Sequence, residues 1–446
     1  MQATIDSANR VIEAAKTAKR AVGALARLTT EEKNAALLAI AREIGEQAGK
    51  ILAANRADLE RGAAMVEAGE MTEAAYSRLK LDEAKVREIA SGVEQVARLE
   101  DPVGKVTMAT ELDEGLRLYR VNCPIGVIGV VFESRPDALT QIASLAIKSG
   151  NAVLLKGGRE AEHSNRALFD AVQNAALRTG IPAGALTLLE SREEVSALLK
   201  AEGFVDLIIP RGSNALVRYV QENTEIPVLG HAEGICHIYV DEAADLDKAE
   251  SIIIDGKMQY PSACNSVETV LIHSRVAESF LPRIMRELER GGVEVRLDEE
   301  AISRFGIRGV KTATEEDWKA EYCDLILSIK VVETIEDAIA HINTHSSHHT
   351  DAIVTEDAAA FDRFFAEVDS AGVYLNASTR FADGYRYGFG AEVGISTGKL
   401  HPRGPVGLEG LVTYKYKLTG EGHTVSMYAG TGARRFTHKK VLSAES

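Results

Sequence analysis

The sequence has few cysteines, few aromatic residues and no long apolar run. Its four cysteines are Cys123, Cys236, Cys264 and Cys323, and no two of them form a Cys-x-x-Cys pair. This spacing predicts neither a disulfide framework nor a structural zinc site, and it favours a reducing compartment. The longest apolar run, Ile125 to Phe132, is interrupted by glycines and is far too short to cross a bilayer. We therefore expect a cytoplasmic protein that does not enter a membrane.

Basic residues are also in the minority. The 446 residues include 51 Lys and Arg against 66 Asp and Glu, which gives a formal charge of −15 at pH 7. Nucleic acid or an anionic membrane surface would require a broad basic face, so neither is an expected partner. An anionic substrate would need a local basic pocket. The length and the 45% hydrophobic content allow large cores in two or three domains.

The first part of the chain predicts helices followed by a hairpin. From Ala3 to about Leu99, apolar residues recur at three- and four-residue spacing, and Thr29-Thr30-Glu31-Glu32 has the form of a capping box. Between Val106 and Asn122, polar and apolar residues alternate, which predicts a β hairpin that stands off the main body. Such an arm usually contacts a partner chain, and the segment Gly410–Leu418 is also strand-like and could join the hairpin.

From Ile125 onward, short β-rich runs alternate with helix-like segments. The predicted strands are 125–132, 152–156, 185–189 and 205–210, and the helices between them are 138–149, 161–179 and 193–201. This alternation predicts a parallel sheet that binds its ligand at the carboxyl ends of the strands. The loops Lys156-Gly157-Gly158-Arg159 and Pro210-Arg211-Gly212-Ser213-Asn214 lie at those ends, so a dinucleotide is the expected ligand. For either loop alone, ordinary turn chemistry is the commoner explanation.

Cys264 lies in a turn directly before a predicted strand, within the segment Met258–Ile272. A thiol in such a turn can face a cleft. Its thiolate attacks carbonyls and also leaves readily, which suits acyl transfer through a thioester. Free cysteines are also common core residues, so the turn by itself leaves both interpretations open.

Two later segments are rich in histidine and in basic residues. His341, His345 and His348 have helical spacing, but Ser and Thr crowd the segment, so we predict no helix there and no metal site. His348 and His349 are better explained by a substrate pocket or a loop. Among many glycines, the second segment gathers side chains that could bind a carboxylate or phosphate, or could be a solvated loop: Arg380, Arg386, Lys399, His401 and Arg403.

Three segments together resemble the aldehyde dehydrogenase superfamily: Pro261-Ser262-Ala263-Cys264-Asn265-Ser266, Phe132-Glu133-Ser134-Arg135-Pro136 and Ser346-Ser347-His348-His349-Thr350-Asp351. The resemblance covers nearly the whole chain and points to the branch that acts on glutamate 5-semialdehyde. It implies an aldehyde dehydrogenase-like α/β fold with three parts. These are a parallel-sheet dinucleotide-binding domain (1–105 and 123–235), an α/β catalytic domain (236–400), and a β oligomerisation arm with a C-terminal segment (106–122 and 401–446).

The resemblance also implies roles for single residues. Cys264 would be the nucleophile. Ser134 stands where many relatives carry an asparagine that binds the oxyanion, which is a departure, but its hydroxyl can still donate beside the backbone N–H of Cys264. The expected substrate contacts are Arg135, His348, His349 and Arg403.

For the cofactor, the resemblance implies NADPH. Lys156 matches the lysine that contacts the adenosine ribose, and Gly212 and Ser213 match the loop over the pyrophosphate. Arg159 stands where NAD-preferring relatives have a carboxylate, and a guanidinium would attract the 2′-phosphate of NADP. Glu321 matches the glutamate that binds the nicotinamide ribose, with a solvated charge as the equally frequent alternative.

The implied activity is the reduction of L-glutamyl 5-phosphate by NADPH to L-glutamate 5-semialdehyde and phosphate, in proline synthesis from glutamate. The expected assembly is a homo-oligomer, and the upstream glutamate kinase is a candidate partner. One alternative is a hydrolytic aldehyde dehydrogenase. Its activating glutamate would fall at Gly230, so only Glu233 could replace it. Another alternative is a catalytically silent oligomeric scaffold with Cys264 in its core.

Overall fold

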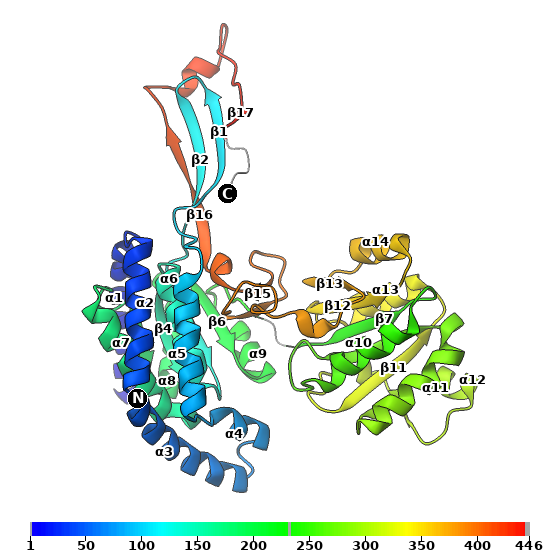
Figure 1. Cartoon of the computed structure of the whole chain (residues 1–446). Coiled ribbons are helices and arrows are strands. Elements are labelled where there is room, and N and C mark those ends of the chain that lie inside the picture. Colours follow the sequence, from blue (N-terminus) through cyan, green and yellow to red (C-terminus); the bar gives the residue numbers. More distant parts are fainter. Residues whose placement is uncertain (1, 231–232, 442–446) are drawn as a thin grey trace. The chain divides into compact units, whose positions relative to one another are not determined.

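The computed structural model describes residues 2–230 and 233–441 (Figure 1). The chain forms two compact units. Unit 1 contains residues 1–229, 390–394 and 406–446, and unit 2 contains residues 230–389 and 395–405. Both units therefore combine segments that are far apart in the sequence. None of the described helices is long and apolar enough to cross a membrane.

Unit 1 begins with five helices, as the helical periodicity predicts. They are α1 (Gln2–Leu25), α2 (Thr30–Glu46), α3 (Ala48–Glu67), α4 (Glu73–Leu79) and α5 (Glu83–Arg98). The predicted capping box starts α2: the Glu32 N–H donates to Thr29 Oγ1 at 3.2 Å, and the Thr29 N–H donates to Glu32 Oε2 at 2.7 Å. The apolar faces of these helices, including Leu37, Ile40 and Val93, are buried in the core of unit 1.

The parallel sheet of unit 1 has the strand order β5-β4-β3-β6, and the alternation of strands and helices is confirmed. Its strands are β3 (Val127–Phe132), β4 (Ala152–Gly157), β5 (Leu186–Leu189) and β6 (Leu207–Arg211). The helices of this part are α6 (Pro136–Lys148), η1 (Arg159–Ala161), α7 (Glu162–Arg178), α8 (Arg192–Leu198) and α9 (Asn214–Glu222). Every residue of β3 and β4 is buried, as expected for a sheet with covered faces.

The predicted hairpin is confirmed as part of an antiparallel sheet with the order β16-β2-β1-β17. Its strands are β1 (Val106–Asp113), β2 (Leu116–Pro124), β16 (Val412–Thr419) and β17 (Lys439–Lys440). β16 pairs with β2 along its whole length, from Val412 opposite Pro124 to Thr419 opposite Arg117. The C-terminal segment thus joins the hairpin as predicted. A short helix, η4 (Leu408–Leu411), precedes β16, and η5 (Val425–Tyr428) follows it.

Unit 2 is built on a seven-stranded parallel sheet with the order β10-β9-β11-β8-β7-β12-β13. Its strands are β7 (Cys236–Val240), β8 (Val267–His273), β9 (Glu294–Leu297), β10 (Lys311–Thr312), β11 (Ile326–Val332), β12 (Thr350–Val354) and β13 (Gly372–Leu375). Its helices are α10 (Leu246–Met258), α11 (Ser274–Arg290), α12 (Glu299–Phe305), η2 (Asp317–Lys319), α13 (Ile335–His345), α14 (Ala358–Glu367) and η3 (Thr379–Phe381). A separate two-stranded sheet pairs β14 (Gly394–Ser396) with β15 (Gly404–Val406).

The prediction that the histidine segment is not helical was wrong for its first half. α13 includes His341 and His345, whose ring centroids lie 4.5 Å apart. A capping box at Thr334 starts the helix, and Ile339 and Ile342 pack into the core of unit 2. Burial of this apolar face outweighs the low helix propensity of the polar residues. His348 and His349 lie beyond the helix, directly before β12.

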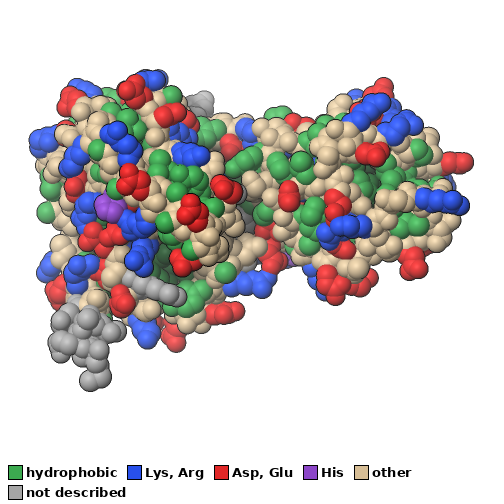
Figure 2. All heavy atoms as spheres, turned by 90° about the horizontal axis from the view of Figure 1, so that it is seen from below, with side chains coloured by type: hydrophobic (Ala, Val, Ile, Leu, Met, Phe, Trp, Pro, Cys, Tyr) green, Lys and Arg blue, Asp and Glu red, His purple; other side chains and the backbone are tan. Residues whose placement is uncertain are grey.

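Charges of both signs are mixed on the face of the molecule that Figure 2 shows. On the face drawn in Figure 2, Lys and Arg side chains are interspersed with Asp and Glu, without a broad basic area among the residues described there. This agrees with the acidic composition. A basic pocket for an anionic ligand would therefore be a local feature.

Asn151 is a buried side chain that connects distant segments of unit 1. It is fully buried, accepts from the Gly126 N–H at 2.8 Å and donates to the Leu411 carbonyl at 2.7 Å. In Asn151→Ala, both backbone groups lose this partner, so we expect the free energy of unfolding to fall by about 2 to 4 kcal/mol. Thermal unfolding followed by circular dichroism should show a lower midpoint. Asn9→Ala, at an exposed position of α1, is the control, and equal midpoints for the two variants would contradict the expectation.

Candidate active site

Cys264 lies in the connection between α10 and β8, where two tight turns shape the backbone. The Ala263 N–H donates to the Tyr260 carbonyl at 3.2 Å, and the Ser266 N–H donates to the Ala263 carbonyl at 2.9 Å. Cys264 is half-buried, whereas Cys236 is fully buried. A partly exposed thiol between two turns is accessible to a small molecule, unlike a core cysteine.

The backbone of Gly234 packs directly against Cys264. A Cβ atom added at Gly234 would overlap the Cys264 carbonyl oxygen and would lie 2.6 Å from the Cys264 Cα. From the start of β7, the Cys236 thiol donates to the same carbonyl at 3.5 Å. Burial raises the pKa of the Cys236 thiol well above its usual range, so this thiol stays protonated and can donate. Residues 234–236 therefore fix one side of the turn.

The η3 segment fixes the other side of the turn. Thr379 Oγ1 donates to the Asn265 carbonyl at 2.7 Å, and Asn265 Nδ2 donates to the Ala382 carbonyl at 2.9 Å. Between these two contacts, the Arg380 side chain reaches back to Gln259, with its Nε donating to Gln259 Oε1 at 3.0 Å. Arg380 is therefore brought to the Cys264 turn, although the sequence indicated it only as one basic residue of a loop.

The segment that carries His348 and His349 is attached to the start of β7. The N–H of Ile235, which lies between Gly234 and Cys236, donates to Ser347 Oγ at 2.8 Å. Ser346 Oγ donates at 2.8 Å to Asp351, a buried carboxylate that also accepts from the His237 N–H. Residues 346–349 are therefore fixed to the start of β7, where Gly234 and Cys236 contact Cys264.

The two histidines themselves differ in burial. His348 has φ 60°, a left-handed conformation, and its side chain is half-buried. His349 is buried, and its Nδ1 lies 2.9 Å from Thr350 Oγ1. Of the two, His348 is thus the more accessible to a substrate.

Arg403, the other expected substrate contact in unit 2, has a carboxylate partner. Its Nη2 lies 3.0 Å from Asp369 Oδ1, and Lys399 Nζ lies 2.6 Å from Asp369 Oδ2. The hydrogen bond from Lys399, followed by that from Arg403, holds the pKa of Asp369 below its usual range. The basic segment therefore divides in two: Arg403 and Lys399 pair with Asp369, and Arg380 contacts the cysteine turn.

In unit 1, Ser134 directs two donors to one carboxylate oxygen. Its N–H and its Oγ lie 2.6 Å and 3.2 Å from Glu160 Oε1. Ser134 has φ 49°, and this left-handed conformation points both groups the same way. The pair can thus donate to a single anionic oxygen, as the predicted oxyanion role requires, once Glu160 releases it. Arg135 follows as the half-buried residue that precedes α6.

The loop predicted to bind the pyrophosphate also holds a carboxylate. The Ser213 N–H donates to Glu133 Oε2 at 2.8 Å, and a Cβ atom at Gly212 would overlap the same oxygen. Ser213 is the N-cap of α9, and a helix N-terminus favours anions. The loop therefore fits a phosphate group, provided that the Glu133 side chain moves aside.

The other expected cofactor residues of unit 1 differ in exposure. Lys156 is buried, and its ammonium donates to the Gly157 carbonyl. Burial lowers the pKa of Lys156, and Glu160 opposes this shift. The Arg159 side chain is exposed, as a residue that reads a 2′-phosphate would be.

Glu321 is half-buried in unit 2, near a fully buried ion pair. In that pair, Lys257 Nζ lies 2.6 Å from Glu268 Oε2. Burial raises the pKa of Glu268 to about 8; Lys257 opposes the shift, and the charge of Glu321 adds to it. Glu321 therefore lies close enough to this pair to act on it electrostatically.

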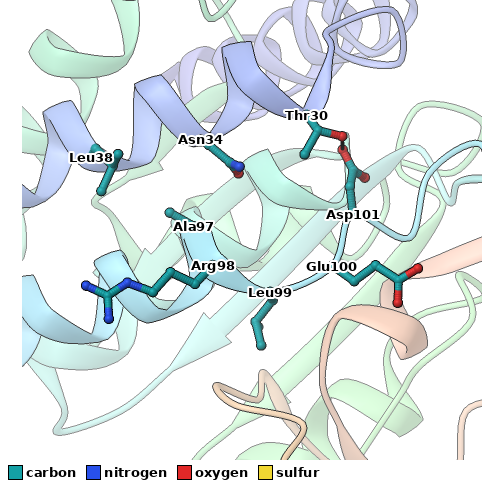
Figure 3. Close-up of a pocket in the computed structure, with 8 residues that line it drawn as sticks. All are labelled: Thr30, Asn34, Leu38, Ala97, Arg98, Leu99, Glu100 and Asp101. Atoms are coloured by element: carbon teal, nitrogen blue, oxygen red, sulfur yellow. Dashed lines mark hydrogen bonds between the residues drawn. The ribbon is translucent and has the colours of Figure 1, made fainter.

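The surface pocket drawn in Figure 3 is unrelated to these residues. It lies between α2 and α5 in unit 1 and is lined by Thr30, Asn34, Leu38, Ala97, Arg98, Leu99, Glu100 and Asp101. Its inner polar groups already have partners: Asp101 accepts from Thr30 and from Lys33, and Asn34 accepts from Lys148. We assign no ligand to it.

Sequence reasoning singled out Cys264 but missed the residues that hold its turn in place. Gly234 belongs to no motif, and Asn265 belongs to the Cys264 segment without an assigned role, because what each residue does depends on contacts with residues distant in the sequence. The sequence marked Gly234 only by its position. It lies two residues before β7, directly after the residues 230–233 that were compared with the activating glutamate of hydrolytic aldehyde dehydrogenases. The described residues contain no group of three or more His, Cys, Asp or Glu that could hold a metal ion.

Gly234→Ala should disturb the Cys264 turn. The added methyl group would overlap the Cys264 backbone, which cannot yield as a flexible side chain would. We expect a loss of stability of about 1 to 3 kcal/mol and a several-fold slower alkylation of Cys264 by iodoacetamide. Mass spectrometry of the tryptic peptide 258–275 reports on this thiol alone. Gly45→Ala, on the open face of α2, is the control; equal alkylation rates in both variants would show that the close contact has no effect on the thiol.

Comparison with known proteins gives the same family by sequence and by structure. Residues 1–303 match the aldehyde dehydrogenase family. The chain is 58% identical over 427 residues to a gamma-glutamyl phosphate reductase of a Synechococcus species, covering 96% of this chain and 93% of the relative. It is 52% identical over 439 residues to the protein of that name from Nostoc punctiforme, covering 98% and 100%.

A crystal structure of the gamma-glutamyl phosphate reductase from Thermotoga maritima matches with a TM-score of 0.89 and 43% identity, covering 93% of this chain and 99% of that one. The two parallel sheets and the order of the elements described above thus belong to an aldehyde dehydrogenase-like α/β fold. An acetylating aldehyde dehydrogenase from Geobacillus thermoglucosidasius, at 18% identity and a TM-score of 0.66, shares the fold alone; it covers 94% of this chain and 98% of its own. The chain belongs to the aldehyde dehydrogenase family.

Proposed function

We propose that this chain reduces L-glutamyl 5-phosphate to L-glutamate 5-semialdehyde and phosphate with NADPH, a step of proline synthesis from glutamate. The observation that carries the proposal is the near-full-length identity, 58% over 96% of the chain, to a gamma-glutamyl phosphate reductase. The half-buried Cys264, fixed from both sides, supports it because the reaction needs an accessible thiol.

The thiolate of Cys264 attacks the acyl carbon of the substrate. The bond from this carbon to the phosphate oxygen breaks, phosphate leaves with the electron pair, and a thioester remains on Cys264. The oxyanion of the tetrahedral intermediate accepts from the Cys264 N–H and from Ser134. Gly234 and Asn265 hold the turn in place during these steps.

NADPH, when bound, would supply a hydride to the thioester carbon. The bond from this carbon to the Cys264 sulfur then breaks, the electron pair leaves with the thiolate, and the aldehyde is released. Gly212 and Ser213 would bind its pyrophosphate with the N-terminus of α9. Lys156 would contact the adenosine ribose, Arg159 the 2′-phosphate, and Glu321 the nicotinamide ribose. Unit 1 thereby acts as the dinucleotide-binding domain, and unit 2 acts as the catalytic domain.

The proposed substrate contacts are Arg135, His348, His349 and Arg403. For Arg403, the role requires that the guanidinium bind the substrate alongside Asp369 or leave that carboxylate.

The antiparallel sheet formed by β16, β2, β1 and β17 is the proposed contact of a homo-oligomer, because Tyr414, Tyr416 and Leu418 are exposed on it. Large apolar side chains that gather on one exposed strand are typical of an interaction surface. Association with the kinase that makes the unstable acyl phosphate, and a cytoplasmic location, complete the proposal.

Phosphate-dependent oxidation of glutamate 5-semialdehyde is the test. With Gly230 in the place of an activating glutamate, water should not cleave the thioester, so NADP reduction should require phosphate or arsenate. The reduction of NADP would be followed by the absorbance of NADPH. Cys264→Ser should abolish this turnover while leaving the fold intact. Steady phosphate-free formation of glutamate, lost in Glu233→Gln, would instead establish a hydrolytic aldehyde dehydrogenase. Near-normal activity of Cys264→Ser would remove this thiol from the mechanism.

Arg159→Glu should change the cofactor preference. A carboxylate repels the 2′-phosphate of NADPH and can accept a hydrogen bond from the 2′-OH of NADH. We expect the ratio of kcat/KM for NADPH to that for NADH to fall by about tenfold or more. The exposed Arg87→Glu, on α5, is a control with the same charge change. An equal ratio in Arg159→Glu and wild type would show that this side chain does not contact the 2′ position.

A further inference from the structure

We propose that Arg380 binds the phosphate group that is transferred to and from the acyl carbon at Cys264. This role rests on the proposed function and adds to it a residue outside the expected substrate contacts. It is supported by the position of Arg380 at the cysteine turn, by its burial without a carboxylate partner among the described residues, and by the directions left open on its guanidinium.

The position follows from contacts on both sides of Arg380 in the chain. Thr379 and Ala382 bind Asn265, the residue after Cys264. The Arg380 side chain extends to the residues before the cysteine, where Nε donates to Gln259 and the guanidinium carbon lies 5.8 Å from the centre of the Tyr260 ring. The guanidinium thus lies along the turn that carries the thiol.

Arg380 is a buried cation. Its exposure is 7%, and no carboxylate within the described ranges forms an ion pair with it. Burial lowers the pKa of Arg380, and Arg386 lowers it further; Cys264 and, at longer range, the carboxylates of Asp255 and Asp383 oppose this shift. Arg386 is close because its Nη1 donates to the Arg380 carbonyl at 2.6 Å. Two neighbouring cations, one of them buried, are stabilised when an anion binds between them.

The guanidinium has the geometry that phosphate requires. Gln259 and the Tyr260 ring hold its Nε side and one face, and neither Nη group hydrogen-bonds to another described residue. The two Nη groups of an arginine can donate in parallel to two oxygens of one phosphate. Such a contact would stabilise phosphate as it leaves the acyl carbon, and would hold it for attack on the thioester in the reverse direction.

The test uses the full-length enzyme in the direction of semialdehyde oxidation. In Arg380→Gln, we expect the KM for phosphate to rise about tenfold to a hundredfold, because hydrogen bonds to charged groups are lost, while the KM for NADP stays the same. Arg380→Lys keeps the charge but loses the parallel donors, so its KM for phosphate should lie between those of wild type and Arg380→Gln. Arg283→Gln, which removes a surface arginine that pairs with Asp247 and Glu250 on α10, is the matched control.

A second measurement does not depend on turnover. Phosphate should slow the alkylation of Cys264 by iodoacetamide in wild type and in Arg283→Gln, and should lose this effect in Arg380→Gln. Unchanged KM for phosphate and unchanged protection in both Arg380 variants would overturn the assignment and leave the proposed function standing. Should Arg380→Gln fail to fold, Arg380→Lys decides by the same two readouts. Wild-type turnover that is independent of phosphate would overturn the proposed function, and this assignment with it.

Discussion

The contact between the backbones of Gly234 and Cys264 is the constraint on which the candidate site depends. The two backbones approach so closely that no side chain fits between them, so the start of β7 and the turn before β8 are locked together. The 346–349 segment then binds to the β7 side through Ile235, and η3 binds to the β8 side through Asn265. Segments far apart in the sequence thereby share one small region of unit 2. A larger residue at position 234 would separate them.

Much of the fold could be predicted from local sequence patterns. The helices before residue 99, the strands that enclose the dinucleotide loops and the hairpin all carry periodicities that survive in the structure, because each element buries one clear apolar face or run. α13 was missed since its polar residues suggested a loop, whereas Ile339 and Ile342 bury its other face. The pairing of β16 with β2 was open to prediction because both segments are strand-like, but its register depends on contacts that the sequence does not display.

The candidate site could be predicted only where chemistry is carried by residue type. Cys264 stood out because a thiol in a turn is unusual, and the resemblance to a known family supplied roles for its neighbours. The sequence could not predict that Gly234 packs against Cys264, that Asn265 binds the η3 segment, or that Arg380 is buried. Each of these features depends on contacts between residues far apart in the chain. The same limit explains why the sequence indicated Arg403 and not Arg380 as a substrate contact: the ion pair between Arg403 and Asp369 is visible only in the structure.

Carboxylates accept hydrogen bonds from the backbone donors of two loops of unit 1. Glu160 accepts from Ser134, and Glu133 accepts from Ser213, so the donors proposed for an oxyanion and for a pyrophosphate are already satisfied. Unpaired donors in partly buried positions would cost about 1 to 3 kcal/mol each. An arriving anion therefore exchanges with an internal carboxylate that can return to water. Arg380 forms no ion pair within the described ranges, and its Nε donates to the neutral Gln259, so an anion can bind there without displacing a carboxylate.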